Sequence, residues 1–275
     1  MYLRCGKFKL DLSRPLIMGI VNVTPDSFSD GGKWVSAPAA INHAQQLVEE
    51  GADILDIGGE STRPGAEPIS LDEELQRVLP VLEGLKGVNV PLSVDTYKPE
   101  VMRAAISAGA SMINDVNALL APGAMDSVAA SDTALCLMHK KGEPKTMQQN
   151  PQYEDVLAEV ADFLKARVAA AEAAGVARER ICIDPGIGFG KSLEHNLALL
   201  RNIGRLKSIG VPVLIGVSRK SLLGKILGLE VYDRVQVNVV AAVLTVRQGA
   251  AIVRVHDVKA TRDALAVYEA VNGEQ

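Results

Sequence analysis

The chain has 275 residues, of which 48% are hydrophobic, and a formal net charge of −4. A length of roughly 250 residues is typical of an α/β barrel, so we expect a single domain over residues 1–275. The lysines and arginines are scattered along the sequence, which gives no support to a nucleic-acid-binding or anionic-membrane-binding protein. Small-molecule partners are therefore favoured.

Cysteine usage and hydrophobic run length point to the cytoplasm. Cys5, Cys136 and Cys182 form no C-x-x-C pair, and two of them lie inside apolar runs. Cysteines of this kind are small buried residues of a reducing compartment. No apolar run approaches the roughly 18 residues that span a bilayer, and no secretory signal opens the sequence. We expect a cytoplasmic protein without a membrane partner.

Strands and helices are predicted to alternate along the whole chain. The first strand is the uninterrupted apolar run 17–22, which is typical of a strand covered on both faces. A polar loop follows it to Gly32, and the next pattern is helical, from Ser36 to Gly51. Later helices are indicated by first-turn or cap residues at Ser70 and Pro99 and by apolar spacing over 153–175. The other strands are predicted at 53–57, 90–96, 111–116, 134–139, 181–184, 211–217 and 251–257.

Eight strand–helix units predict an α/β fold, a single (β/α)₈ TIM barrel. A doubly wound open sheet rarely needs so many units. In a barrel the active site lies at the C-terminal ends of the strands. The polar residues expected at that end are Asn22, Asp95, Asn114, Asp184, Lys220, Arg254 and His256.

The polar residues at the strand ends predict the chemistry of a ligand. Buried carboxylates at one barrel mouth are costly without partners, so Asp95, Asn114 and Asp184 predict a flat heterocycle rich in N–H donors. Lys220 is suited to a carbonyl or ring nitrogen of the same ligand. The planar guanidinium of Arg254 can stack on such a ring while its edge reaches an anion.

Three further residues predict a phosphate-like anion, namely Asn22, Arg63 and His256. Any metal is expected to be Mg²⁺ held largely by that phosphate, with Asn22 as a protein ligand, because one Asn and no carboxylate–His cluster cannot hold a dedicated site. The four histidines lack zinc spacing, which argues against a zinc enzyme.

The segment 184–191, D-P-G-I-G-F-G-K, is not a Walker A loop, because Pro185 stands where that motif needs glycine. Its glycines are better explained by a close approach of backbone to a flat ligand, with Phe189 as an apolar wall. Ser221 is predicted to begin a helix, whose N-terminal N–H groups suit a carboxylate. The site therefore has room for a second, acidic substrate.

Several segments in one order resemble the dihydropteroate synthase family of bacterial folate biosynthesis, over nearly the whole chain. They are N-V-T-P-D-S-F-S-D-G-G (22–32), G-G-E-S-T-R-P-G (58–65), S-V-D-T (93–96), I-N-D (113–115), D-P-G-I-G-F-G-K (184–191), S-R-K-S (218–221) and R-V-H-D (254–257). The resemblance implies condensation of 6-hydroxymethyl-7,8-dihydropterin diphosphate with p-aminobenzoate, which gives 7,8-dihydropteroate and pyrophosphate. It also implies a homodimer, Mg²⁺ and a sulfonamide target.

The same resemblance implies the roles of individual residues. The pterin-binding residues would be Asp95, Asn114, Asp184, Lys220 and Arg254. The diphosphate-binding residues would be Asn22, Thr62, Arg63, Arg254 and His256. The p-aminobenzoate-binding residues would be Phe28, Pro64, Phe189, Lys220 and Ser221.

In the family mechanism pyrophosphate leaves first, and the aniline then captures a pterin-stabilised cation. An aniline is a weak nucleophile, so stabilisation of separated charge must carry most of the barrier reduction. Asp30, rather than Asp26, is expected to face the cation. The residues expected to act in catalysis are Asp30, Asp95, Asp184 and Lys220.

One segment departs from the family pattern. After Arg234 the family usually has Gly-Ser or Ala-Ser, whereas this chain continues V-Q-V-N-V-V-A-A. The segment is expected to lie away from the pterin contacts and near the dimer interface.

Other functions stay open: a pterin-binding methyltransferase that serves a corrinoid protein, a Schiff-base aldolase using Lys220, a non-catalytic pterin binder, and a sulfonamide-insensitive synthase.

Overall fold

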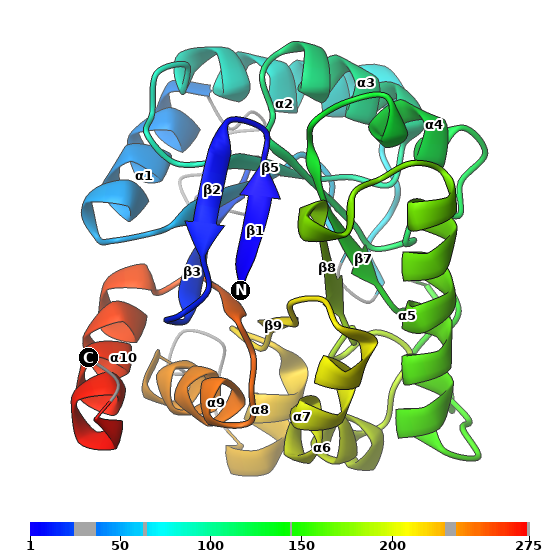
Figure 1. The fold of residues 1–275 in the computed structure, drawn as a ribbon, viewed down its shortest axis with the longest axis vertical. Coiled ribbons are helices and arrows are strands. Elements are labelled where there is room, and N and C mark those ends of the chain that lie inside the picture. The colour runs from blue at the N-terminus through cyan, green and yellow to red at the C-terminus, as the bar shows by residue number, and fades with distance from the viewer. Residues whose placement is uncertain (25–36, 63–64, 144, 229–234, 274–275) are drawn as a thin grey trace.

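The computed structural model describes residues 1–24, 37–62, 65–143, 145–228 and 235–273 (Figure 1). Its strands are β1 (Tyr2–Cys5), β2 (Phe8–Asp11), β3 (Leu16–Asn22), β4 (Ile54–Gly58), β5 (Leu92–Asp95), β6 (Met112–Asp115), β7 (Ala134–Met138), β8 (Ile181–Asp184), β9 (Leu214–Gly216) and β10 (Ile252–Val255). Its α-helices are α1 (Ala37–Glu49), α2 (Leu71–Gly84), α3 (Pro99–Ser107), α4 (Ala124–Ala129), α5 (Val156–Ala173), α6 (Leu193–Arg201), α7 (Ile203–Leu206), α8 (Ser221–Leu227), α9 (Val235–Arg247) and α10 (Val258–Asn272). Two 3₁₀-helices, η2 (Arg178–Arg180) and η3 (Lys207–Ile209), precede β8 and β9.

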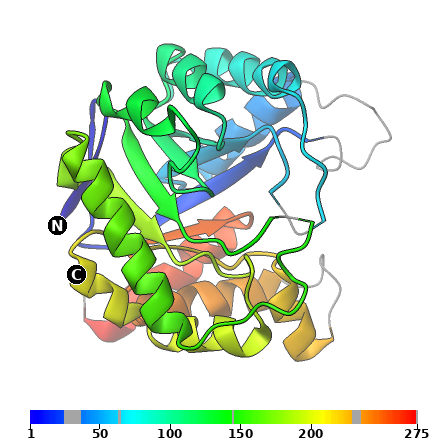
Figure 2. The ribbon, with the colours of Figure 1, turned by 90° about the vertical axis from the view of Figure 1, so that its right-hand side faces the viewer.

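Eight parallel strands form the barrel, in the order β8-β7-β6-β5-β4-β3-β10-β9. The two ends of this sheet meet through a parallel bridge between Ile183 and Val213, and the Ile183 N–H donates to the carbonyl of Pro212 at 2.9 Å. Helices surround the strands on the outside (Figures 1 and 2). The predicted (β/α)₈ barrel is confirmed.

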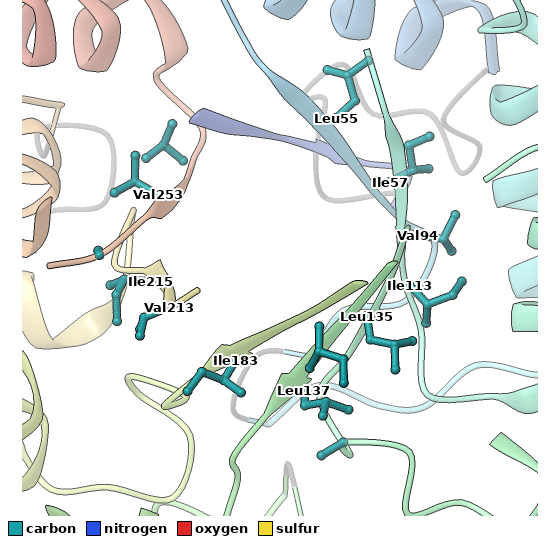
Figure 3. Close-up of a cluster of buried hydrophobic side chains, with 14 of the residues drawn as sticks. Leu55, Ile57, Val94, Ile113, Leu135, Leu137, Ile183, Val213, Ile215 and Val253 are labelled. Carbon is teal, nitrogen blue, oxygen red and sulfur yellow. The ribbon is translucent and has the colours of Figure 1, made fainter. Parts of the chain in front are cut away.

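The strands are buried on both sides, and their side chains alternate between two environments. Residues that point outward pack against the helices, as Leu55, Val94, Ile113 and Ile183 do in Figure 3. The intervening residues point into the barrel, where Met18, Ile54, Met112, Cys182 and Leu214, among others, form a separate apolar cluster. This two-sided burial explains why the strand sequences are continuously apolar.

The N-terminal hairpin β1–β2 closes the end of the barrel from which the parallel strands start (Figure 2). Leu3 and Cys5 are fully buried and belong to the apolar cluster inside the barrel. The predicted elements begin at residue 17, so this hairpin was not predicted. Because the hairpin covers that end, a ligand reaches the barrel interior from the end where the strands finish.

Helix starts follow the local capping chemistry. The Ser70 hydroxyl accepts from the Glu73 N–H at 3.2 Å, so α2 begins where predicted, and α3 begins at Pro99 as predicted. The helix predicted from residue 153 begins instead at Val156, because the Asp155 carboxylate accepts from the Leu157 and Ala158 N–H groups. Within the described ranges, no helix has the length and apolar character needed to cross a membrane.

Candidate functional site

Polar side chains replace the apolar ones at the last inward-facing positions of several strands. Asp95 ends β5, Asn114 lies beside it in register on β6, and Asp184 ends β8. All three are buried. Arg254 points into the same space from β10, where its neighbours in register are Met18 and Gly216. The predicted convergence of these residues at the C-terminal end of the barrel is therefore observed.

Arg254 joins two buried carboxylates across this layer. Its Nε lies 2.5 Å from Oδ2 of Asp56, and its Nη2 lies 2.9 Å from Oδ2 of Asp95. The Asn114 amide donates to the same oxygen of Asp56 at 3.0 Å. Asp56, on β4, was not among the predicted site residues, although it alternates in phase with Ile54 and Gly58. A carboxylate at an inward position of an apolar strand was the signal that could have identified it.

Burial makes the carboxyl groups of Asp95 and Asp184 weaker acids than usual. Burial raises the pKa of Asp95 well above its ordinary value, the nearby Arg254 charge opposes the rise, and Asp56 adds to it. Burial likewise raises the pKa of Asp184, against the opposing charge of Lys220. Oδ1 of Asp95 is buried and accepts no hydrogen bond from the described part of the chain. A ligand with N–H groups would supply the donor that this oxygen lacks.

Lys220, which directly precedes α8, lies over the loop that follows β8. Its ammonium donates to the carbonyl of Ile187 and lies 4.8 Å from the centre of the Phe189 ring. Burial lowers the pKa of Lys220 to about 8, although the charge of Asp184 opposes that shift. Lys220 and Asp184 therefore face one region of the site.

The glycine-rich loop is held from within by Lys191. This lysine is 2% exposed, donates to the carbonyls of Gly186 and Phe189 at 3.0 Å each, and lies 3.0 Å from Nδ1 of His139. A Cβ at Gly186, whose φ is +68°, would lie 1.8 Å from the His139 carbonyl oxygen, so only glycine fits there. Lys191 thus binds its own loop, which agrees with the rejection of a Walker A motif. The sequence analysis assigned Lys191 no role.

His256 follows β10 at the same rim of the barrel. Its Nδ1 lies 3.0 Å from the Ser218 hydroxyl, and its backbone N–H donates to that hydroxyl at 3.3 Å. Asn22 ends β3 opposite Gly58, and a Cβ at Gly58 would contact both Oδ1 of Asn22 and Cβ of Asp95. The structure therefore brings the Asn22 amide close to the buried carboxylate layer.

A cavity of about 250 Å³ lies among the loops that follow β4, β5, β6, β7 and β8. Thr62 and Phe189 both line it, together with Tyr97, Lys140 and Lys145. Phe28, Asp30, Arg63 and Pro64 lie outside the described residues. Ser221 begins α8 as predicted, but its side chain also lies outside the description. No group of three or more His, Cys, Asp or Glu residues suited to a metal occurs within the described ranges.

Known proteins are similar to this chain in both sequence and fold. The family model described as "Pterin binding enzyme" matches residues 18–256. This chain belongs to the dihydropteroate synthase family. The dihydropteroate synthase of Neisseria meningitidis serogroup B is 54% identical over 275 residues, which cover 98% of this chain and 96% of the relative.

Two solved members of the dihydropteroate synthase family are similar in structure. The Burkholderia cenocepacia enzyme, complexed with 7,8-dihydropteroate, is 51% identical with a TM-score of 0.91, over 99% of this chain and 96% of the other. The Xanthomonas albilineans enzyme, with 4-aminobenzoic acid, is 53% identical with a TM-score of 0.93, over 98% of each chain. As a member of this family, the present chain is a transferase.

Asp56→Ala should lower the free energy of unfolding by about 3 kcal/mol, because it leaves the half-buried Arg254 guanidinium with one carboxylate in place of two. Urea unfolding of both proteins measures the difference. Asp132→Ala is the control, since the Asp132 side chain is 80% exposed in its ion pair with Arg4 and its loss should change stability little. Equal stabilities of the two variants would contradict a structural role for Asp56.

Proposed function

We propose that this chain condenses 6-hydroxymethyl-7,8-dihydropterin diphosphate with p-aminobenzoate, giving 7,8-dihydropteroate and pyrophosphate. The observation that carries the proposal is the group of buried and half-buried hydrogen-bonding side chains at one end of the barrel. These are Asp95, Asn114, Asp184, Lys220 and Arg254. Such a group suits a flat ring that carries amino, ring N–H and carbonyl groups. The ligands of the two solved relatives support the same substrates.

The pterin is proposed to bind between the carboxylates and the cations of this layer. Asp95 and Asp184 would accept hydrogen bonds from the amino and ring N–H groups, with Asn114 beside them. Lys220 would donate to the carbonyl or a ring nitrogen. Arg254 would lie over the ring while Asp56 and Asp95 hold its guanidinium. A guanidinium fixed by two carboxylates has a defined orientation, which favours stacking.

The diphosphate is proposed to lie at the rim formed by Asn22, Thr62, Arg63, Arg254 and His256. The Asn22 carboxamide provides a hard oxygen ligand beside the carboxylate layer, and this donor fits Mg²⁺ that is also held by diphosphate oxygens. When bound, Mg²⁺ would supply positive charge to the leaving group. His256, oriented by Ser218, would donate to the departing anion.

p-Aminobenzoate is proposed to bind beside the pterin, against Phe189 and Lys220. Phe28, Pro64 and Ser221 would complete this second site. The cavity lined by Thr62 and Phe189 supports this location. The separation of Lys220 Nζ from the Phe189 ring, 4.8 Å, is that of a cation–π contact and fixes both groups.

The proposed reaction begins with cleavage of the bond between the pterin methylene carbon and the diphosphate oxygen. The electron pair leaves with pyrophosphate, and the pterin ring delocalises the positive charge. Asp30 would face that cation, while Asp95, Asp184 and Lys220 hold the ring. The aniline nitrogen then forms the new C–N bond and loses a proton. Opposite charges preorganised at the two ends stabilise this separation of charge.

The first test is pyrophosphate release from the purified protein given dihydropterin diphosphate and Mg²⁺, with and without p-aminobenzoate. Release that increases with p-aminobenzoate, together with formation of dihydropteroate, is expected.

Asp184→Asn should lose pterin affinity because an amide replaces one acceptor, whereas Ser221→Ala should mainly raise KM for p-aminobenzoate. Tight pterin binding without pyrophosphate release would contradict the proposal and favour a passive binder or a corrinoid methyltransferase.

The second test is the pH dependence of kcat/KM for dihydropterin diphosphate, which reports groups of the free enzyme. Burial lowers the pKa of Lys220 to about 8, so its ammonium is lost as pH rises through that value. The kcat/KM should therefore fall above about pH 8. Lys220→Arg keeps its charge to higher pH and should remove this fall, although its activity is lower. An identical fall in both proteins would assign the titration to another group.

The protein is further proposed to act in the cytoplasm as a homodimer through the outer faces of α9 and α10. These helices pack side by side (Figure 1). Val240 and Leu244 on α9, and Val267 and Val271 on α10, each expose more than half of their surface. Both pairs have i, i+4 spacing, so they form two adjacent apolar stripes. Exposed apolar surface of this kind commonly marks a protein interface.

Val240→Asp combined with Leu244→Asp should dissociate this dimer, because two charges would be buried unpaired at the interface. Analytical ultracentrifugation should show a change from the mass of two chains to the 29.2 kDa of one. Leu120→Asp is the matched control, since Leu120 is similarly exposed but follows β6. A dimer retained in the double variant would contradict this interface.

A further inference from the structure

Asn238 is a buried amide on the inner face of α9, 3% exposed, and both of its polar groups are used. Its Oδ1 accepts from the Arg219 backbone N–H at 3.0 Å. Its Nδ2 donates to Oδ2 of Asp257 at 3.2 Å. Asn238 belongs to the segment that departs from the family pattern after Arg234. That segment is expected to lie away from the pterin contacts, and Asn238 bonds instead to the sequence neighbours of Lys220 and His256.

The two partners of Asn238 lie in the two turns that carry proposed ligand-binding residues. Arg219 directly precedes Lys220 in the turn after β9. Asp257 directly follows His256 in the turn after β10. The Arg219 guanidinium also donates to Oδ1 of Asp257 at 3.0 Å, so Arg219, Asp257 and Asn238 form a closed ring of contacts. Asn238, on α9, therefore connects the turn after β9 to the turn after β10.

Arg219 needs external support for its backbone conformation. Its φ is +57°, in the left-handed region, which is unfavourable for a residue with a Cβ by about 1 kcal/mol. Such a conformation persists when surrounding hydrogen bonds fix it. The bond from the Arg219 N–H to Asn238 is one of these, and it lies one residue before Lys220. A change at Asn238 is thus transmitted directly to the backbone that carries the Lys220 side chain.

We propose that Asn238 is a positioning residue, which sets the turns of Lys220 and His256 relative to each other through Arg219 and Asp257. The inference rests on the proposed roles of Lys220 and His256 toward the pterin diphosphate. Asn238 itself touches no substrate. Its loss should therefore weaken the handling of the pterin diphosphate, which both turns contact through Lys220 and His256. The effect on p-aminobenzoate should be smaller, because only one of the two turns, that of Lys220 and Ser221, is proposed to contact it.

The test compares Asn238→Asp with the exchange variant N238D/D257N. In N238D the new carboxylate still accepts from the Arg219 N–H but repels Asp257 where the amide donated. KM for dihydropterin diphosphate should rise roughly tenfold, which is less than the ~100-fold cost of a 1 Å displacement of reacting groups. KM for p-aminobenzoate should rise by a smaller factor, because it is proposed to contact only the turn of Lys220 and Ser221. The exchange variant restores one amide and one carboxylate and should recover most of the loss.

Two further variants separate positioning from general stability. Thr245→Val removes another buried polar group of α9, whose hydroxyl donates to the Ala242 carbonyl of the same helix. Both KM values should stay unchanged in this variant. Asn238→Leu keeps the branched shape of the side chain and removes both hydrogen bonds, so it should behave like N238D and keeps the test open if N238D does not fold. Thermal unfolding is recorded for every variant.

Three results would overturn the proposal. The first is an unchanged KM for dihydropterin diphosphate in folded N238D and N238L. The second is a loss confined to kcat and matched by Thr245→Val, which would indicate a lower folded fraction only. The third is no recovery in the exchange variant. Lys220→Ala is measured in parallel. If K220A leaves the KM for dihydropterin diphosphate unchanged, the proposed role of Lys220 is contradicted and the inference fails with it. If K220A raises this KM and N238D does not, only the inference about Asn238 is overturned.

Discussion

Arg254 places one guanidinium between two carboxylates inside a barrel, and the arrangement of the site depends on that contact. Asp56 is fully buried and Asp95 nearly so; without a cation their burial would be strongly unfavourable. The contact draws β4, β5 and β10 into one polar layer above the apolar cluster that fills the rest of the interior. Because Asn114 donates to Asp56 as well, the layer extends to β6. The other oxygen of Asp95, Oδ1, has no hydrogen-bond donor among the described residues.

Around this layer, short hydrogen-bonded links fix the turns that follow the strands. Lys191 holds the glycine-rich loop through its own carbonyls, and Ser218 holds His256. Lys98 binds Glu74 at 2.6 Å, and also Glu60, at the start of the loop that carries Thr62. Lys191, Ser218 and Lys98 have no proposed contact with a substrate. They restrict the positions of those that do, and preorganisation of that kind is what electrostatic catalysis requires.

The sequence was sufficient to predict the barrel, because eight apolar runs and their caps are local signals. It also predicted which strands end in polar residues, and the barrel geometry then brought Asp95, Asn114 and Asp184 together. Asp56 was missed, because only polar residues at the ends of strands were candidates, and Asp56 is an inward-facing residue inside a strand. The contacts of Asn238 could not be predicted, since they join residues 19 positions apart in sequence through the packing of α9 on two turns. Such pairings depend on tertiary geometry and not on local pattern.

The acidity of the buried carboxyl groups connects this architecture to ligand choice. Burial raises the pKa of both Asp95 and Asp184, which means that their charged forms are less stable in the barrel than in water. A ligand that donates N–H groups stabilises the charged form and lowers the pKa again, whereas a ligand of acceptors cannot. Lys220 has the opposite shift for the same reason, because burial disfavours its ammonium. A ring with donors on one edge and acceptors on another offsets the burial cost of all three groups at once. The burial of these groups therefore favours a ligand with that pattern of donors and acceptors.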